Sequence, residues 1–454
     1  MRRIALVLAE HRYNKNSVAV LTGAVEASAC AAHVDVCFSK PGAASVFACL
    51  DRASARPPGH AGGGAIPITP QTKSPRTPDM IVLGCSFATA AVPDAAATLR
   101  RARIEAAGRG WPLVTLAGGP HPSGDPAGTL AMGFDLVLCG EGEEALPLLL
   151  DRFAAETSPG DVPGLCWMED GALHRNPRPR AVDLDTFPPF APGAGRNAPF
   201  ELSRGCPWGC RFCETTFLTG ARPRHRSLER LVHWAEVARA NGNRDLRFLS
   251  ADSFAWGSTD GGPADPVRLD ELLGESVRIF GRGHVFFGSF PSEARPEHVT
   301  PDLVEVVARH AANDSIAFGA QSGSDRILKA IHRGHDSDAV RRAARVVLAA
   351  GLRPIVDFIC GLPGEDPSDR EATRGLIREL ADLGAVVHTH TFMPLPGTHL
   401  WAGPPGEVDD VTRELLDTLA SQGRHIGRWR THQGQARRTA AFLAALEHGG
   451  GILP

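Results

Sequence analysis

The chain has 454 residues, of which 43% are hydrophobic and 22% charged, and its formal net charge is −3 at pH 7. This length is too great for one ordinary core and predicts two domains. The small net charge gives no electrostatic argument for a nucleic-acid partner or an anionic membrane surface. No stretch approaches the roughly 18 apolar residues that span a bilayer, and the first residues have too short an apolar core for a signal peptide. We therefore expect a cytoplasmic protein with neither nucleic acid nor membrane as a partner.

Residues 1–150 alternate apolar runs with alanine-rich segments. The runs predict buried parallel strands at 3–9, 33–38, 79–84, 112–117 and 135–139. Segments 17–31 and 93–108 are typical of the crossover helices between such strands. The pattern predicts a doubly wound α/β, Rossmann-like domain over residues 1–150, interrupted by a Pro/Gly/Ser-rich surface loop at 51–78.

A second alternating series follows a linker. Residues 151–196 are rich in Pro and Gly and predict that linker, with one hairpin around 169–171. The second series predicts a partial (β/α)6 barrel of the TIM type over residues 197–400, whose active site would lie at the C-terminal ends of the strands. Its strands are expected at 199–203, 245–250, 284–290, 315–319, 354–360 and 386–393. Residues 401–454 predict a helical C-terminal segment, with helices at 410–421 and 435–447.

Helix boundaries in this second series have recognisable signals. Ser227 and Thr300 are each placed to cap a helix, and a first-turn proline follows Thr300. Ser368 and Glu371 have the spacing of a capping box. A glycine at 351 and another at 384 are expected to end the helices before them.

The cysteines fall into two groups. Three of them, Cys206, Cys210 and Cys213, form a C-x3-C-x2-C motif in the stretch GCPWGCRFCE, directly after the first strand of the second series. Such a cluster is compatible with chance, with a structural zinc site or with an iron–sulfur cluster. Zinc sites usually take four side-chain ligands, so the pattern favours an iron–sulfur cluster with one iron open to a small molecule. The other seven are interpreted as small buried hydrophobic residues: Cys30, Cys37, Cys49, Cys85, Cys139, Cys166 and Cys360.

This motif resembles that of the radical S-adenosylmethionine (radical SAM) superfamily, and Phe212 matches the aromatic residue usual before the third cysteine. The resemblance implies that the three cysteines hold a catalytic [4Fe–4S] cluster whose open iron binds S-adenosylmethionine. An external one-electron reductant of the flavodoxin or ferredoxin type would then allow cleavage to a 5′-deoxyadenosyl radical.

Later strand ends carry further matches to the same superfamily. The resemblance implies that Asp252 lies near the methionine amine and that Arg333 pairs with the methionine carboxylate. It places Gln321 and Ser322 in the pocket wall. Gly361 would lie beneath the adenine, and Pro394 belongs to the segment that hydrogen-bonds it.

The N-terminal domain carries glycine-rich turns after its strands. Glycines at such places let a backbone approach a bulky ligand, or make tight turns only. The turns GCSFATA, GGPHP and GEGE resemble those of the cobalamin-binding domain that precedes many radical SAM enzymes. The resemblance implies contacts to cobalamin from Ser86, Phe87, Gly118, Gly119, His121, Gly140, Glu141 and Gly142.

One departure from the cobalamin-binding pattern concerns the metal. The D-x-H-x-x-G motif that supplies a histidine to cobalt is absent, so the resemblance implies cobalamin without a histidine from that motif. We expect a structural or supporting role for His121, which lies between two prolines, and surface exposure for Tyr13.

The two resemblances together imply a cobalamin-dependent radical methyltransferase acting on an unactivated carbon of a small molecule or peptide held between the two domains. A non-methylating rearrangement or ring closure, a methylthiotransferase-like activity and a non-catalytic cobalamin or redox sensor are the alternatives. Glu293 is expected either to orient a substrate amine or to pair with Arg295. Residues 423–438 are interpreted as a solvated loop flanking a helix rather than a cover over an acidic substrate.

Overall fold

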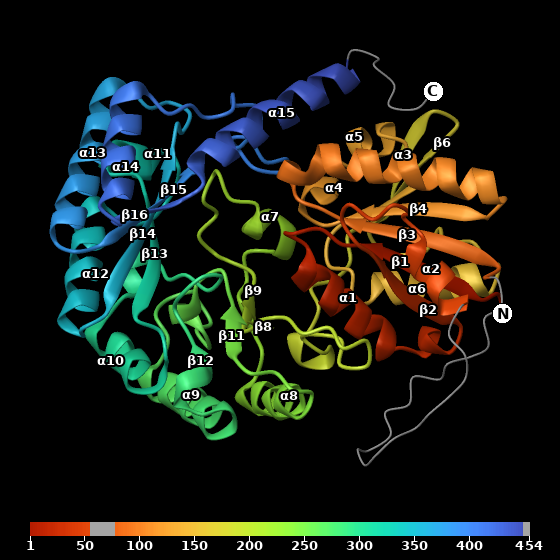
Figure 1. The fold of residues 1–454 in the computed structure, drawn as a ribbon, viewed down its shortest axis with the longest axis horizontal. Helices are drawn as coiled ribbons and strands as arrows, with labels where there is room; N and C mark the ends of the chain where they lie inside the picture. Colours follow the sequence, from red (N-terminus) through yellow and green to blue (C-terminus); the bar gives the residue numbers. More distant parts are fainter. Residues whose placement is uncertain (55–77, 448–454) are drawn as a thin grey trace. The chain divides into compact units, whose positions relative to one another are not determined.

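The computed structural model describes residues 1–54 and 78–447. The chain divides into two compact units (Figure 1). Unit 1 comprises residues 1–182, 186–198 and 442–454, and unit 2 comprises residues 183–185 and 199–441. Most of the loop expected at 51–78 lies outside the described residues, and residues 51–54 are helical rather than part of a loop.

Unit 1 is built on a sheet whose described strands have the order β2-β1-β3-β4-β5-β6-β7. The first five are parallel, as expected, and β6 and β7 form an antiparallel hairpin with its turn at Asp170 and Gly171, where the linker hairpin is expected. The strands are β1 (Ile4–Ala9), β2 (Val34–Ser39), β3 (Met80–Ser86), β4 (Leu113–Gly118), β5 (Leu136–Leu138), β6 (Leu165–Glu169) and β7 (Ala172–Arg175). The α-helices are α1 (Lys15–Glu26), α2 (Ala48–Ser54), α3 (Val92–Arg109), α4 (Pro120–Gly124), α5 (Pro126–Ala131) and α6 (Ala145–Ala154). Short 3-10 turns are η1 (Ala29–Ala32), η2 (Thr89–Ala91) and η3 (Leu184–Thr186).

Helices cover both faces of this sheet, which confirms the doubly wound arrangement. Side chains of β1 alternate between two cores, with Val7 packed in the cluster that contains α3 and Leu6 in the cluster that contains α1 and α6. This alternation follows from the two-residue period of a strand. The order 2-1-3-4-5 reverses direction between β1 and β3, and ligands of open α/β sheets bind at the carboxyl edge beside such a reversal.

Unit 2 contains the expected alternating β/α series. The strands are β8 (Phe200–Glu201), β9 (Ser203–Arg204), β10 (Arg224–His225), β11 (Leu246–Leu249), β12 (Val285–Phe286), β13 (Ser315–Gln321), β14 (Arg353–Cys360), β15 (Val386–Thr391) and β16 (His425–Gly427). The α-helices are α7 (Thr215–Thr219), α8 (Leu228–Ala240), α9 (Pro266–Phe280), α10 (Pro301–His310), α11 (Asp325–Ala330), α12 (Ser337–Ala349), α13 (Pro367–Asp382), α14 (Asp410–Ser421) and α15 (Trp429–Glu447), the last of which runs on into unit 1. The 3-10 turns are η4 (Ser253–Ala255), η5 (Arg282–His284) and η6 (Pro296–His298).

The parallel strands of unit 2 form two sheets that meet at one seam. One has the order β12-β11-β8, and the other the order β13-β14-β15-β16. At the seam the N–H of Ala317 donates to the oxygen of Gly288 at 2.8 Å, and Ala294 bridges Phe318. Strands β8, β11, β12, β13, β14 and β15 occupy the six expected positions, so the loops after them share the carboxyl end of the unit.

Three details bear on the sequence-based expectations for unit 2. The helix expected to begin with a capping box at Ser368 is capped by Asp366 instead, with Asp369 as the reciprocal partner. The segment 401–454 is not wholly helical, because β16 extends the sheet beside β15. Ser227 and Thr300 are the N-caps expected, and each accepts a hydrogen bond from a first-turn N–H group.

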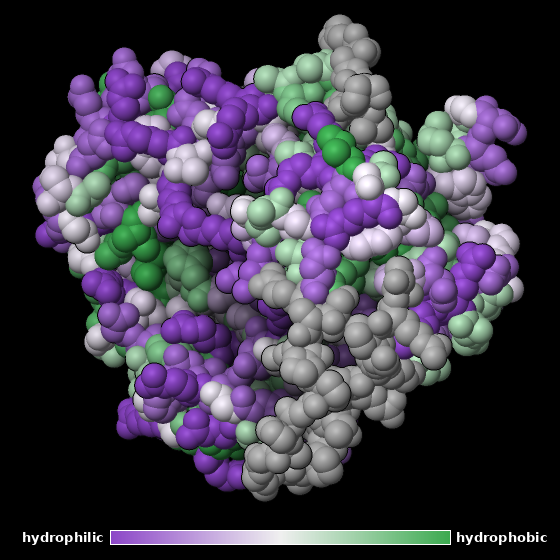
Figure 2. Space-filling view, turned by 45° about the vertical axis from the view of Figure 1, so that its right-hand side comes forward, coloured by the Kyte–Doolittle hydropathy of each residue, from purple (hydrophilic) through white to green (hydrophobic). Residues whose placement is uncertain are grey.

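The surface agrees with the composition. Hydrophilic side chains predominate on the face seen in Figure 2, and hydrophobic ones form small groups among them. Among the described residues, no helix is long and apolar enough to cross a membrane. Tyr13 is 55% exposed, as expected.

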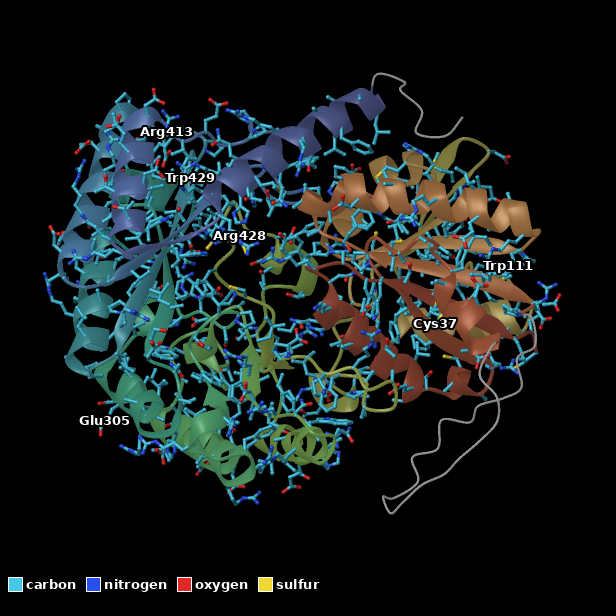
Figure 3. All side chains as sticks on the ribbon, in the orientation of Figure 1. Cys37, Trp111, Glu305, Arg413, Arg428 and Trp429 are labelled. Carbon is cyan, nitrogen blue, oxygen red and sulfur yellow. The ribbon has the colours of Figure 1, made fainter. Side chains whose placement is uncertain are left out.

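The isolated cysteines are more varied than small buried hydrophobic residues. Cys30, Cys85, Cys139, Cys166 and Cys360 are buried, as expected. Cys37 on β2 (Figure 3) is only half-buried, and its Sγ lies 2.7 Å from the Sγ of Cys49.

Candidate functional site

The cysteine loop follows β8 and β9 and is fixed by its own backbone. Gly205 has φ +91°, and a Cβ there would lie 2.3 Å from the oxygen of Arg222. The N–H of Cys206 donates to the oxygen of Gly220 at 3.0 Å, and the hydroxyl of Thr216 donates to the oxygen of Cys206 at 2.7 Å. Only glycine combines this conformation with so close an approach. The loop is therefore held at its first cysteine independently of any bound group.

The second half of the loop is held from α11. The N–H of Arg211 donates to the oxygen of Ile331 at 2.9 Å. Phe212 packs against the cluster that contains Ile327 and Phe392, so the aromatic residue anchors the loop on apolar side chains. Cys206, Cys210 and Cys213 are thus presented from one rigid loop.

The spacing of the three sulfurs is not that of a single-ion site. Ligands of one zinc ion at about 2.3 Å lie roughly 3.8 Å apart. Among the described residues, only Asp357, His388 and His390 bring three potential ligand atoms within 4.8 Å of one another. The cysteine loop is wider than this, as a multi-iron cluster requires.

Two buried guanidinium groups face the middle cysteine. Nη1 of Arg333 lies 3.7 Å from the Sγ of Cys210, and Nη1 of Arg295 lies 3.9 Å from the same atom. The guanidinium of Arg295 also lies 3.9 Å above the ring of Trp208. Burial raises the pKa of Cys206 and of Cys213.

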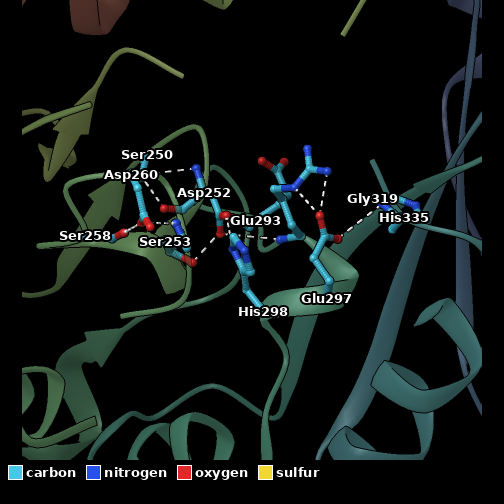
Figure 4. A network of polar contacts seen from close by, with 12 residues as sticks. Ser250, Asp252, Ser253, Ser258, Asp260, Glu293, Glu297, His298, Gly319 and His335 are labelled. Carbon is cyan, nitrogen blue, oxygen red and sulfur yellow. Dashed lines mark hydrogen bonds and ion pairs between the residues drawn. The ribbon is translucent and has the colours of Figure 1, made fainter. Parts of the chain in front are cut away.

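A polar network adjoins these arginines (Figure 4). Oδ2 of Asp252, after β11, contacts Nδ1 of His298 at 2.6 Å, and both side chains are buried. The N–H of Arg295 donates to Oδ1 of Asp252 at 3.4 Å. Nε of Arg295 donates to Glu297 at 2.6 Å, and Glu297 in turn contacts His335 at 3.2 Å.

The carboxylate partner of Arg295 is therefore Glu297 rather than Glu293. Glu293 lies near Asp357 and His388, and burial, with the charge of Asp357 as a second cause, raises its pKa. The structure thus excludes one of the two roles expected for Glu293, the pairing with Arg295.

Of the other residues expected in the pocket of unit 2, Gln321 and Arg333 lie close together, whereas Ser322 points elsewhere. Gln321, at the end of β13 with φ +71°, and Arg333 both reach the position that a Cβ on Gly319 would occupy. Ser322 is turned toward α13, where its hydroxyl lies 3.3 Å from that of Thr373. This contact gives Ser322 a structural place rather than one in the pocket wall.

Gly361 and Pro394 follow neighbouring strands. A Cβ on Gly361 would lie 2.4 Å from the nitrogen of Glu407, so the chain's own backbone requires this glycine. Pro394 is buried after β15, where Phe392 N–H donates to the oxygen of Cys360 at 2.9 Å.

In unit 1 the loops after β3 and β4 pack closely against each other. A Cβ on Gly119, which has φ +91°, would lie 2.7 Å from Oγ of Ser86 and 3.0 Å from the nitrogen of Phe87. His121 is fully buried, its ring stacks on Phe87 at 5.9 Å, and its Nδ1 contacts Thr89 at 3.1 Å. Burial lowers the pKa of His121 to about 4, so its imidazole is neutral. These contacts agree with a structural role for His121.

Gly118 and the loop after β5 complete the same edge. Gly118 ends β4 opposite Leu138, the last residue of β5. The N–H of Gly140 donates to Ser123 at 3.0 Å. Glu141 accepts from the N–H of Val182, and Gly142 closely faces Leu21 of α1. The loops at this carboxyl edge are therefore packed closely on neighbouring parts of unit 1.

One group of polar side chains in unit 2 was not expected from the sequence. Asp357, His388 and His390 converge from β14 and β15, and Nδ1 of His432 on α15 lies 2.9 Å from Nδ1 of His390. The alternation HTH in VVHTHT already places both strand histidines on one face.

The interpretation of residues 423–438 as a solvated loop is wrong. They form β16 and the start of α15, where Figure 3 shows Arg428 and Trp429. Trp429 is only 5% exposed and packs with Leu416 and Cys360.

Comparison with known proteins is consistent with this geometry. Residues 200–377 match the Radical SAM superfamily. This segment of the chain, less than half of its length, is similar to the radical SAM superfamily. The matched region contains the cysteine loop, Asp252, Gln321 and Arg333.

Relatives of this chain differ in their assigned reactions. A tRNA-2-methylthio-N(6)-dimethylallyladenosine synthase of Cereibacter sphaeroides is 30% identical over 296 residues, which are 62% of this chain and 64% of that protein. An uncharacterized methyltransferase of Pyrococcus horikoshii is 26% identical over 303 residues, 64% of this chain and 62% of that protein. The chain thus spans just under two thirds of the length of these relatives.

Solved structures show the same fold over both units. The radical S-adenosylmethionine methyltransferase TsrM from Kitasatospora setae, with cobalamin and a [4Fe–4S] cluster bound, matches with a TM-score of 0.62 and 16% identity, over 88% of this chain and 74% of that one. The cobalamin-dependent radical enzyme OxsB matches with a TM-score of 0.62 and 15% identity, over 93% of this chain and 56% of that one. The fold of this chain is therefore similar to that of these two enzymes.

Orphaned polar atoms around the cysteine loop fit a bound polar group. Among the described residues, Oε1 of Gln321, Nε of Arg333 and Oε2 of Glu214 are buried without hydrogen-bond partners. Burial also raises the pKa of Glu214 to about 7. Because buried polar groups are normally satisfied, these atoms indicate that the loop is shaped for a polar ligand.

Proposed function

We propose that the chain is a cobalamin-dependent radical SAM methyltransferase that methylates an unactivated carbon of a small molecule or peptide. The observation that carries the proposal is the pairing of two features in one chain. Unit 2 has a three-cysteine loop at the carboxyl end of its β/α series, and unit 1 has glycine turns at the carboxyl edge of a 2-1-3-4-5 sheet. The fold that combines them is shared with TsrM and OxsB.

In this proposal the residues of unit 2 hold and tune the radical-generating group. Cys206, Cys210 and Cys213 bind a [4Fe–4S] cluster, and Arg333 and Arg295 stabilise the thiolate of Cys210. Gln321 and Asp252 supply polar contacts for S-adenosylmethionine. The cluster and S-adenosylmethionine together supply a 5′-deoxyadenosyl radical, with an electron from an external flavodoxin- or ferredoxin-type reductant.

Unit 1 would hold cobalamin against the edge formed by the loops after β3, β4 and β5. Gly118, Gly119, Gly140 and Gly142 lie at the ends of these strands or in the turns after them, and bound cobalamin would supply the methyl group. Ser86 and Glu141 lie in the same loops, and buried His121 supports the loop beneath Phe87. The cobalt receives no ligand from His121 in this account.

A methylthiotransferase is the second candidate, because one relative at 30% identity has that assignment. Such an enzyme would need a further set of cluster cysteines. Among the described residues of unit 1, no three cysteines approach one another closely, and the contacts between sulfurs are pairs, Cys37 with Cys49 and Cys139 with Cys166. The fold of unit 1 favours methyl transfer, and a non-methylating radical rearrangement is the remaining alternative.

Methyl transfer can be tested with a panel of candidate substrates. The full chain is reconstituted anaerobically with iron, sulfide and hydroxocobalamin, and then incubated with deuteromethyl S-adenosylmethionine, a reductant and candidate substrates. We expect 5′-deoxyadenosine and S-adenosylhomocysteine to form together, with a deuterated methyl group on a carbon of one substrate. Formation of 5′-deoxyadenosine without S-adenosylhomocysteine, or of an S-methyl product, would refute methyl transfer to carbon. Cys210→Ala is the matched inactive control.

A further inference from the structure

A second group of potential ligands lies in unit 2, separate from the cysteine loop. Asp357 on β14 and His388 on β15 are register partners, and His390 lies two residues further on the same face of β15. These three side chains are half-buried, whereas Val356 and Phe358 on the other face of β14 are fully buried.

The group faces the interior of the β/α unit. The ring of Phe290, which follows β12, lies 4.7 Å from the ring of His388. Glu293, in the same segment, is close enough to Asp357 for their charges to interact. Side chains that follow β12 therefore meet side chains of β14 and β15 across the unit, although β13 lies between these strands in the chain.

The distances match those around one metal ion. Oδ1 of Asp357 lies 2.7 Å from Nδ1 of His388 and 3.3 Å from Nε2 of His390. Ligands placed about 2.1 Å from one ion are separated by roughly 3.0 Å in octahedral and 3.4 Å in tetrahedral geometry. An ion would therefore replace the protons between these atoms with little movement of the side chains.

His432 is placed to form a hydrogen bond with His390 without being a metal ligand itself. Its Nδ1 lies 2.9 Å from Nδ1 of His390, and the two rings are stacked 4.8 Å apart at an interplanar angle of 8°. A histidine that binds a metal through one ring nitrogen typically donates a hydrogen bond from the other, which fixes its tautomer and orientation. His390 would bind through Nε2 and donate from Nδ1 to His432.

The charge around the group also suits a cation. Among the described residues, the ion pairs of Asp357 are with His388 and His390 alone, and no Lys or Arg neutralises it. Glu293 adds a second carboxyl group nearby. A divalent cation would balance these two carboxylates.

We propose that Asp357, His388 and His390 bind a divalent transition-metal ion of the zinc or iron(II) class, and that His432 orients His390. Two imidazoles and one carboxylate are a common ligand set for such ions, and three protein ligands leave coordination positions open. A carboxylate, hydroxyl or amine of a substrate can take an open position inside the unit. The site is independent of the cluster and cobalamin of the proposed function.

The test is a titration of the chelator-washed full-length chain with Co²⁺, followed by displacement with Zn²⁺. We expect one Co²⁺ per chain with visible d–d bands and no intense thiolate charge-transfer band, because the ligands are nitrogen and oxygen. Binding at the cysteine loop would show that thiolate band, so the two sites are distinguished in one spectrum. Substitution of the three loop cysteines should remove only the thiolate band.

Four variants decide the assignment. His388→Ala and Asp357→Asn should weaken Co²⁺ binding at least tenfold, and His432→Phe should weaken it by about tenfold to a hundredfold, as loss of an outer partner does. His284→Ala is the matched control, because His284 contacts Asp245 at 2.9 Å at the surface without a third ligand, and it should bind as wild type. Asp357→Asn preserves the shape of the side chain, so this variant still tests the metal site if His388→Ala fails to fold. Absence of the non-thiolate Co²⁺ spectrum in the wild type, or wild-type affinity in Asp357→Asn, would overturn the proposal.

Discussion

Arg333 directs its guanidinium at Cys210, with Nη1 3.7 Å from Sγ, and both side chains are buried. The same guanidinium donates from Nη2 to the oxygen of Gly319 at 2.9 Å, so its orientation is fixed by the end of β13. A fixed positive charge beside a cluster thiolate favours the reduced, more negative cluster. Under the proposed function, Arg333 would therefore have an electronic effect on the cluster in addition to any contact with S-adenosylmethionine.

Replacement of Arg333 by Gln should lower the midpoint potential of the cluster, because it removes that charge and keeps a hydrogen-bond donor. We expect a shift on the order of 60 mV, the one-electron equivalent of about 1.4 kcal/mol. Potentiometric titration followed by electron paramagnetic resonance measures it. Arg333→Lys, which keeps the charge, should restore most of the potential, and an unchanged potential in Arg333→Gln would contradict the assignment.

Gly205 should be indispensable for the loop. A side chain at 205 meets the oxygen of Arg222 at 2.3 Å with φ at +91°, so Gly205→Ala should displace the loop and abolish iron binding. Gly110, which follows α3 in unit 1, has φ +64° and ψ +28° with no atom within 4 Å of its Cβ position. Gly110→Ala should therefore cost only about 1 kcal/mol of backbone strain and retain iron. Iron content after anaerobic reconstitution compares the two, and equal iron in both would refute the steric argument.

Substitution of Cys206, Cys210 and Cys213 together by Ala should remove all cluster iron and the broad visible absorbance of thiolate-held clusters. Cys37→Ser is the control, because this half-buried cysteine contacts Cys49 in unit 1 and should leave iron unchanged. Iron and absorbance per chain are the readouts. Retention of iron by the triple variant would refute the assignment of these three cysteines as cluster ligands.

Unit 1 should lose stability in mild acid because of His121. Burial lowers the pKa of His121 to about 4 from an ordinary 6.5, so between these values the unfolded chain binds the proton and the folded chain does not. The neutral state of buried His121 thus contributes about 3 kcal/mol to the free energy of unfolding of unit 1 above about pH 7. This contribution is lost as the pH falls toward 4. Hydrogen exchange of β4 and β5 at pH 7 and pH 4.5 measures the loss. His121→Gln, which cannot titrate, should show a smaller pH dependence, and an equal one would contradict the prediction.

Much of the fold was predictable because its signals are local. Continuous apolar runs mark β1 and β3 as buried parallel strands, and Ser227 and Thr300 cap their helices by accepting hydrogen bonds from the first turn. Strand β16 was not predictable, since three residues between charged and glycine positions carry no strand pattern. Asp366 was missed as a cap although Pro367 after it is a standard first-turn signal.

The site was only partly predictable, for a different reason. The cysteine motif lies within eight consecutive residues, so its spacing is visible in the sequence. The contact of Arg295 with Cys210 joins residues 85 positions apart, and it depends on how β8, β12 and β13 come together. The pairing of Asp357 with His388 depends likewise on the register of β14 and β15.

In the proposed function, one chain carries a [4Fe–4S] cluster in unit 2 and cobalamin in unit 1. The most direct measurement is the iron and corrin content of the full chain, purified without oxygen from cells supplied with cobalamin and then denatured to release both groups. The account predicts about four irons and one corrin per chain, with corrin retained and cluster iron lost when Cys206, Cys210 and Cys213 are replaced by Ala. Four irons with no corrin, even after reconstitution with hydroxocobalamin, would contradict it.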